Sequence, residues 1–115
     1  VDQELWEIPA GRLESAEDPR SGVQRELEEE VGVHAQGLES LCTVYTTPGF
    51  CDETLHLFRA SRLEDVPPRP EADERIEIRL MTLEEARGLM RRGEIRDAKT
   101  LLALLLEGER RAEKR

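Results

Sequence analysis

The feature that most constrains this chain is a set of glycine, acidic and basic residues at fixed spacing within residues 11–33. Five residues separate Gly11 from Glu17, and seven more lead to the block Arg-Glu-Leu-Glu-Glu-Glu-Val-Gly-Val that begins at Arg25. Nine positions of this pattern are specified by residue type, namely Gly11, Glu17, Arg25, Glu26, Leu27, Glu29, Glu30, Gly32 and Val33. Ordinary residue frequencies give a chance match at all nine on the order of 10⁻⁹ to 10⁻¹⁰ per starting point. The spacing therefore carries structural and chemical information.

The middle of this region is predicted to be a helix. Asp18 and Pro19 suit the N-cap and the first helical position, and Gly32 suits the position just after the C-terminal end. We therefore expect a polar loop over 12–17, followed by a helix that ends at about Val31.

An acidic edge follows from this helix. Glu26 and Glu30 are one turn apart on one side, and with Glu29 they border the apolar stripe through Val23 and Leu27. Three carboxylates held so close repel one another and lose part of their hydration, so a cation must compensate them. Mg²⁺ or Mn²⁺ suits carboxylates that also meet substrate phosphates.

Taken alone, residues 26–30 are typical of a solvated helix face. The register of the surrounding pattern makes that a minor alternative, and five of its residues are interpreted as structural: Gly11, Glu14, Glu17, Arg25 and Gly32. We expect Arg25 to pair with Glu14 or Glu17 and hold the loop against the helix. Gly11 permits a tight turn, which lets the carbonyl of Ala10 face the cation.

The rest of the chain alternates strand-like and helical segments. Strands are predicted from β-branched, aromatic or alternating apolar residues at 4–8, 38–46, 54–60 and 76–80. Prolines make 64–74 a loop. Thr82 and Glu85 form a capping box that opens a helix to about residue 91, and Asp97 caps a last helix whose end frays from residue 107.

Length and composition limit the fold class and the kinds of partner that the chain can have. The 115 residues predict one α/β domain over 1–108 with a charged tail at 109–115. A net charge of −9 argues against nucleic acid or an anionic membrane surface as partner. Cys42 and Cys51 are too few for a disulfide framework, so a cytoplasmic location is expected. Because the chain starts at Val1, we expect a longer protein with an upstream region.

Residues 11–33 resemble the Nudix box, G-x5-E-x7-R-E-U-x-E-E-x-G-U with U aliphatic, at all nine specified positions. The resemblance implies an α/β/α sandwich with a mixed sheet, here without its N-terminal strands. It also implies Mg²⁺- or Mn²⁺-dependent hydrolysis of a nucleoside diphosphate linked to another group. By position, Glu26 and Glu30 match the principal metal ligands, and Glu29 and the Ala10 carbonyl assist, with Glu29 also a candidate catalytic residue.

Beyond the box, the chain resembles the ADP-ribose pyrophosphatase branch. Residues 6–11 look like its lead-in, Pro48 within 47–53 matches its downstream proline signature, and 94–102 are similar to its C-terminal helix. The implied reaction converts ADP-ribose and water into AMP and ribose 5-phosphate. The resemblance also implies a homodimer acting on a small nucleoside diphosphate sugar.

This branch draws a further glutamate from a loop before the last strand, as general base or additional ligand. Glu74 is the first candidate here and Glu71 the second, with a solvated loop charge as the alternative. Gly49, Phe50 and Glu53 are candidates for substrate contacts, although Pro48-Gly49 alone is also typical of a turn and Phe50 of a packing residue.

Two other functions compete with ADP-ribose hydrolysis. One is a pyrophosphatase for another nucleotide sugar such as GDP-mannose. The other is a non-catalytic Nudix-like module that senses ADP-ribose and regulates a partner, which the retained box glutamates disfavour.

Overall fold

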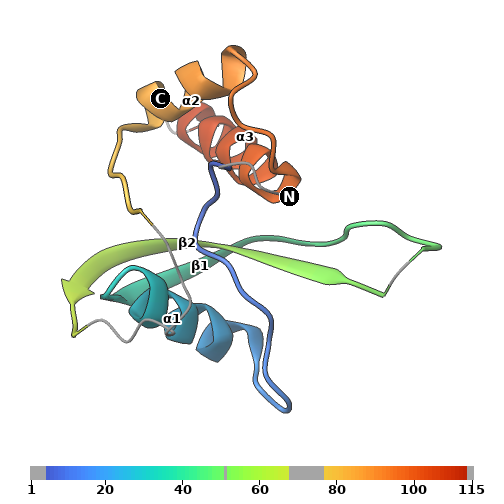
Figure 1. Ribbon diagram of the computed structural model, residues 1–115, viewed down its shortest axis with the longest axis vertical. Helices are drawn as coiled ribbons and strands as arrows, with labels where there is room; N and C mark the ends of the chain where they lie inside the picture. The colour runs from blue at the N-terminus through green and yellow to red at the C-terminus, as the bar shows by residue number, and fades with distance from the viewer. Residues whose placement is uncertain (1–4, 51, 68–76, 114–115) are drawn as a thin grey trace. The chain divides into compact units, whose positions relative to one another are not determined.

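The computed structural model describes residues 5–50, 52–67 and 77–113 (Figure 1). The chain divides into two compact units, one made of Val1–Ile8 with Arg79–Arg115 and the other of Pro9–Ile78. The elements in chain order are α1 (Pro19–Glu30), β1 (Val33–Tyr45), β2 (Thr54–Asp65), α2 (Leu83–Arg91) and α3 (Ala98–Glu113).

Helix α1 has the ends that the sequence predicts. The Asp18 side chain accepts a hydrogen bond from the Ser21 N–H at 2.9 Å, which satisfies a donor that the first turn leaves open. At the other end Gly32 has a φ of +73°, and its N–H bonds the Leu27 carbonyl at 2.9 Å. A glycine adopts this left-handed conformation without steric cost, so it can stop the helix.

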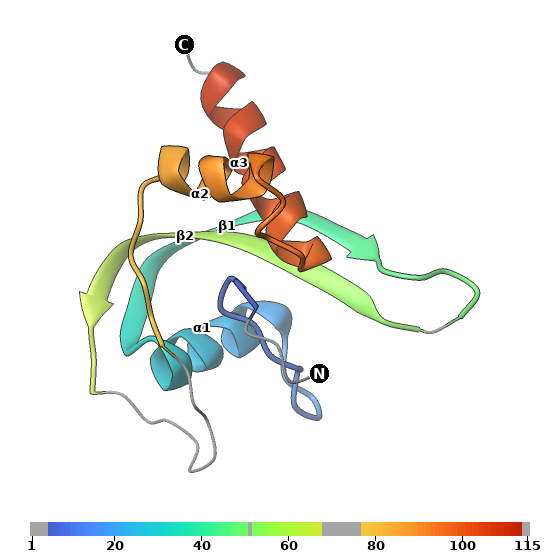
Figure 2. The same ribbon diagram turned by 45° about the horizontal axis from the view of Figure 1, so that its top comes forward.

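Strands β1 and β2 form an antiparallel hairpin, paired from Val33 opposite Asp65 to Tyr45 opposite Thr54 (Figures 1 and 2). The register shifts between Ser40 and Cys42 on β1. Both strands extend beyond the predicted ranges 38–46 and 54–60 at the end near α1. The hydrogen bonds between paired strands join backbone groups. The pairing can therefore continue through polar positions that interrupt the strand-like pattern of the sequence.

Helix α1 packs against β1, and one side chain joins them by two hydrogen bonds. The Gln24 amide accepts from the Ala35 N–H at 3.0 Å and donates to the Ala35 carbonyl at 2.5 Å, as a neighbouring strand would. Leu27, Ala35 and Leu57 are buried in the same unit. This small core anchors the face of α1 next to its acidic edge.

The other unit contains α2 and α3, which contact each other. The predicted capping box at α2 is confirmed: the Thr82 hydroxyl accepts from the Glu85 N–H at 3.0 Å, and the Glu85 carboxylate accepts from the Thr82 N–H at 3.3 Å. Asp97 accepts from the Thr100 N–H at 3.2 Å, as a cap of α3 should.

Helix α3 continues to Glu113, so the prediction of a frayed segment from residue 107 is wrong for the described part of that segment. Glu107 pairs with Arg110 at 3.7 Å and with Arg111 at 2.9 Å, one turn further along. These pairs support a helical last turn in a polar stretch.

Two predicted strands are not formed where the structure describes them. Residues 5–8 of the segment 4–8 and residues 77–80 of the segment 76–80 belong to no sheet, and Leu80 is 94% exposed. An alternating pattern gives a strand only when a neighbouring strand pairs with it, and β1 and β2 pair with each other.

The α/β content is confirmed. Within the described ranges the sheet is two-stranded and antiparallel, in place of the predicted mixed sheet, and the sandwich stays a prediction. None of the helices in those ranges is both long and apolar enough to cross a bilayer.

Candidate functional site

The loop before α1 is tied to the helix by Arg25. Its Nε and Nη2 donate to the two oxygens of Glu17 at 2.9 and 3.1 Å, and Nη2 also donates to the Arg12 carbonyl at 2.9 Å. Glu14 lies 3.5 Å from Nε. These hydrogen bonds lower the pKa of Glu17 and raise the pKa of Arg25. The predicted pairing that holds the loop on the helix is confirmed.

Arg25 also reaches the acidic edge. Its Nη1 donates to Glu26 at 2.9 Å and to Glu29 at 3.3 Å. The side chains of Arg25, Glu26 and Glu29 are only 19%, 14% and 21% exposed. One guanidinium therefore neutralises part of a charge cluster that is partly withdrawn from water.

The turn before the loop meets the other side of this cluster. The Ala10 N–H donates to the Glu30 carboxylate at 3.2 Å. The predicted contact of the Ala10 carbonyl with a cation stays a prediction. A Cβ atom on Gly11 would lie 2.0 Å from the Glu26 carboxyl carbon. Close approach of Glu26 thus requires a glycine at position 11. Gly11 does not have a positive φ, because the described glycines with a positive φ are Gly32, Gly49 and Gly93.

Gly22 is a structural residue that the sequence analysis missed. It is buried in α1, and a Cβ there would lie 2.4 Å from a Leu13 methyl and 3.2 Å from a Glu17 oxygen. The available signal was a glycine inside an otherwise helical segment, which often marks close packing.

The donor set of α1 fits a hard divalent cation by its chemistry. Glu26 and Glu30 both contact the Ala10–Gly11 turn, and Glu29 shares Arg25 with Glu26. Carboxylate oxygens are the ligands that Mg²⁺ and Mn²⁺ take. In this conformation their oxygens bond to Arg25 and Ala10, and across 5–50, 52–67 and 77–113 no three acidic, histidine or cysteine side chains converge.

The predicted substrate residues lie at the tip of the hairpin, which points away from α1 in both views (Figures 1 and 2). The tip is closed by Thr46, whose hydroxyl donates to Glu53 at 2.7 Å. Phe50 is 95% exposed, and Gly49 has a φ of +93°. The structure therefore does not bring Gly49, Phe50 and Glu53 together with the α1 carboxylates. The other two candidates, Glu71 and Glu74, lie outside the described residues.

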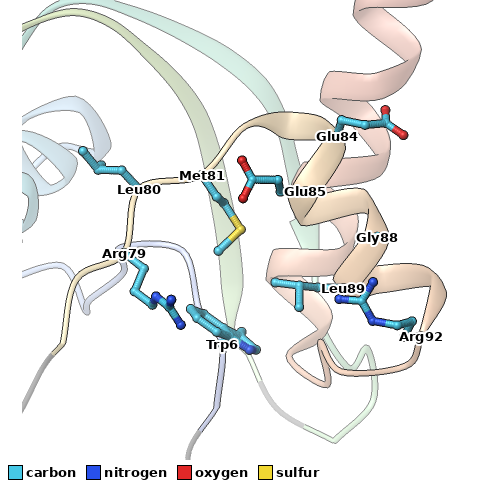
Figure 3. A pocket seen from close by; sticks show the side chains of 9 residues that line it. All are labelled: Trp6, Arg79, Leu80, Met81, Glu84, Glu85, Gly88, Leu89 and Arg92. Carbon is cyan, nitrogen blue, oxygen red and sulfur yellow. The ribbon is translucent and has the colours of Figure 1, made fainter.

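The unit with α2 and α3 has a hollow of about 480 Å³. Trp6, Met81 and Leu89 face it, and the Arg79 guanidinium lies over the Trp6 ring at 5.7 Å (Figure 3). Its rim mixes arginines with acids such as Glu84, so its charge favours neither an anion nor a cation.

Comparison with known proteins finds a matching family model and several similar proteins. A family model described as the NUDIX domain matches residues 1–104. The chain is 42% identical over 106 residues to "ADP-ribose pyrophosphatase" of Bacillus subtilis, which covers 90% of the chain and 57% of the relative. It is 40% identical over 107 residues to "Methanol dehydrogenase activator" of Bacillus methanolicus, with the same coverage of 90% and 57%.

A third relative is "GDP-mannose pyrophosphatase" of Cronobacter sakazakii, 38% identical over 104 residues, 87% of the chain and 53% of the relative. The chain thus spans little more than half the length of the relatives it matches.

Proposed function

The chain belongs to the NUDIX domain family, and on that basis we propose that the protein hydrolyses the diphosphate of ADP-ribose or a related ADP-sugar with a divalent cation. The products are AMP and a sugar phosphate. The observation that carries this proposal is the placement of Glu26 and Glu30, one helical turn apart, against the Ala10–Gly11 turn.

In this proposal Glu26 and Glu30 are the principal ligands of Mg²⁺ or Mn²⁺, and Glu29 and Ala10 assist. When bound, the cation supplies positive charge for the diphosphate and lowers the pKa of a water. The chain carries a net charge of −9 and would repel an anionic substrate by itself. Arg25 holds the loop and the acidic edge in register for this binding.

The remaining residue roles are also proposals. Glu74, or else Glu71, serves as the general base from its loop. Gly49, Phe50 and Glu53 contact the substrate, which requires a hairpin tip from a second copy because the tip of the same chain points away from α1. The proposed active species is accordingly a homodimer.

The test uses the full-length protein and a panel of nucleotide sugars with Mg²⁺ or Mn²⁺. We expect AMP release from ADP-ribose, and a loss of about 100-fold or more in kcat for Glu30→Gln, because the substitution keeps the shape and removes a ligand charge. Glu28→Gln is the matched control on the same helix. Its partner is His34 at 3.3 Å, so its activity should stay close to that of the parent. Normal hydrolysis by Glu30→Gln would contradict the ligand assignment.

A second candidate is hydrolysis of GDP-mannose, favoured by the 38% identity to the Cronobacter sakazakii protein of that name. Preferential GMP release in the same panel would select it. ADP-ribose binding without turnover of any panel member would instead indicate a sensing module.

A further inference from the structure

Two side chains on one side of α1 join the helix to the hairpin, within one of the two compact units. Gln24 accepts from the Ala35 N–H at 3.0 Å and donates to the Ala35 carbonyl at 2.5 Å. One turn earlier, Arg20 donates to the Leu38 carbonyl at 2.8 Å, and its guanidinium lies 5.4 Å from the centre of the Phe58 ring. Because Phe58 belongs to β2, α1 is joined to both strands.

The two hydrogen bonds of Gln24 are directional. Ala35 is 2% exposed, so water is not available to replace a lost partner of its N–H or carbonyl. A glutamine amide carries one acceptor and one donor group, and Gln24 uses both on the same residue. Since hydrogen bonds weaken steeply away from their preferred angles, this pair fixes the position of α1 along β1 and its rotation about the helix axis.

Apolar packing fixes that rotation less well. Leu27 is the buried apolar side chain of α1, whereas Val23, on the same stripe, is half-buried. Hydrophobic contact is non-directional, so a narrow apolar stripe resists rotation of the helix only weakly. The orientation of α1 against the hairpin therefore depends mainly on Gln24, with Arg20 beside it.

The proposed metal ligands move with α1 as one body. Arg25 ties the loop before α1 to the helix, and Gly11 lies against the Glu26 carboxyl group. Glu30 accepts from the Ala10 N–H at 3.2 Å. A change in the orientation of α1 against the hairpin should therefore carry these ligands along together and leave their mutual arrangement intact.

The hairpin leads to the other part of the proposed site. Just beyond the end of β2, the Val66 N–H donates to the Gly32 carbonyl at 2.9 Å, so this end of the hairpin lies beside the C-terminal end of α1. Glu71 and Glu74, the candidate general bases, follow Val66 in the sequence. The orientation of α1 against the hairpin therefore sets where the chain that carries them starts relative to the metal ligands.

A small rotation of α1 is enough to matter. Side-chain ends lie about 5–6 Å from the axis of a helix, so a rotation of about 10° moves a carboxylate by about 1 Å. A misplacement of about 1 Å, even one caused by a residue far from the chemistry, can lower a rate about 100-fold.

We propose that Gln24 is a positioning residue, which orients the α1 carboxylates against the hairpin and so against the groups that act on the substrate together with the metal. This inference rests on the proposed function. It assigns to Gln24 an effect on kcat and not on cation affinity.

The test compares Gln24→Met with the parent in the full-length protein. Methionine keeps the length of the side chain and removes both hydrogen bonds. We expect kcat for ADP-ribose, counted per Mn²⁺ site, to fall about tenfold or more. The Mn²⁺ affinity and the number of sites, both measured by electron paramagnetic resonance of free Mn²⁺, should stay close to those of the parent.

Gln36→Met on β1 is the matched control, because the Gln36 side chain bonds Glu64 across the hairpin at 3.3 Å. Its kcat and its Mn²⁺ affinity should match those of the parent.

Gln24→Asn is a second variant, which keeps an amide beside Ala35 as a polar partner. Its side chain is one methylene shorter and cannot make both hydrogen bonds with α1 in the observed place, so kcat per Mn²⁺ site should fall again. Thermal unfolding separates a positioning role from a structural one. A lower melting temperature with unchanged kcat per Mn²⁺ site in both Gln24 variants would show a merely structural contact and overturn the proposal. Weaker Mn²⁺ binding in both would also overturn it, because the ligands would then not move as one body.

The failure of the proposed function looks different. In that case the parent releases no AMP from ADP-ribose, or Glu30→Gln hydrolyses it as the parent does, and the role of Gln24 is rejected together with the site. If the parent turns over and Glu30→Gln does not, normal turnover by both Gln24 variants rejects the role of Gln24 alone.

Discussion

At the residue scale, Arg25 carries the local architecture of the site. Its guanidinium contacts the loop through Glu17 and Arg12 and the helix through Glu26 and Glu29, so four partners share one side chain. Such a fork needs the planar geometry of arginine, because a lysine ammonium is a compact point charge on a flexible stem.

Arg25→Lys should therefore lower the free energy of unfolding by about 1 kcal/mol, because the site is partly screened by water but several bonds are lost. Urea denaturation followed by circular dichroism measures this change. Arg91→Lys on α2, whose partner Glu84 lies at 3.5 Å on the surface, is the control and should change little. Equal stability of the two variants would contradict the role given to Arg25.

A substitution at Gly11 is expected to lower activity without lowering stability. In Gly11→Ala the new Cβ must displace the Glu26 carboxyl group, which can swing away because it ends a flexible side chain. We expect hydrolysis by the full-length protein to fall at least about tenfold, with little change in the unfolding transition.

The control for Gly11→Ala is Gly108→Ala in α3, where a Cβ would lie 3.9 Å from Arg87. It should raise stability by about 0.5–1 kcal/mol through helix propensity and leave hydrolysis unchanged. If Gly11→Ala retains full activity, hydrolysis does not depend on the close approach of the Glu26 carboxyl group to Gly11.

At the scale of elements, the parts that the sequence predicts best are those whose determinants are local. Asp18, Gly32 and the Thr82–Glu85 box define helix ends within a few residues, and the structure confirms them. The segments 5–8 and 77–80 show the opposite case, because a strand depends on a distant partner that no local pattern reveals. Within the site, the Arg25 pairing was predictable from nearby residues, whereas the packing of Leu13 against Gly22 depends on how the loop folds onto the helix.

The start of α3 also makes a prediction about pH. Burial alone would raise the pKa of Asp97, but hydrogen bonds from Thr100 and Lys99 outweigh it and hold the pKa below its ordinary value of 3.8. Its ionisation therefore stabilises the fold above about pH 4. This contribution is lost as the pH falls through the lowered pKa. Asp97→Asn keeps a capping oxygen and removes the charge.

We therefore expect the unfolding free energy of Asp97→Asn to lie below that of the parent at pH 6 and to converge with it as the pH falls toward 2. Urea titrations at a series of pH values give the difference, in which the shared contributions of Glu17 and Asp18 cancel. A constant gap down to pH 2 would contradict the shift.

At the scale of the whole molecule, the negative net charge is the property that bears most on substrate binding. The excess of 26 acidic over 17 basic residues opposes any anionic substrate. Under the proposed function, EDTA should reduce hydrolysis of ADP-ribose by the full-length protein at least about 100-fold, and Mg²⁺ should restore it. An unchanged circular dichroism spectrum in EDTA controls for unfolding, and undiminished turnover in EDTA would exclude the proposal.

The position of the Arg25 Nη1 group between Glu26 and Glu29 also bears on selectivity among ions. In the proposed site a cation shares Glu26 and Glu29 with the positive charge that Arg25 already supplies. A monovalent ion would meet carboxylates that are already partly neutralised, so its attraction to them would be weak. A divalent ion brings twice the charge to the same place, so under the proposed function we expect valence to matter for selection before size or geometry does.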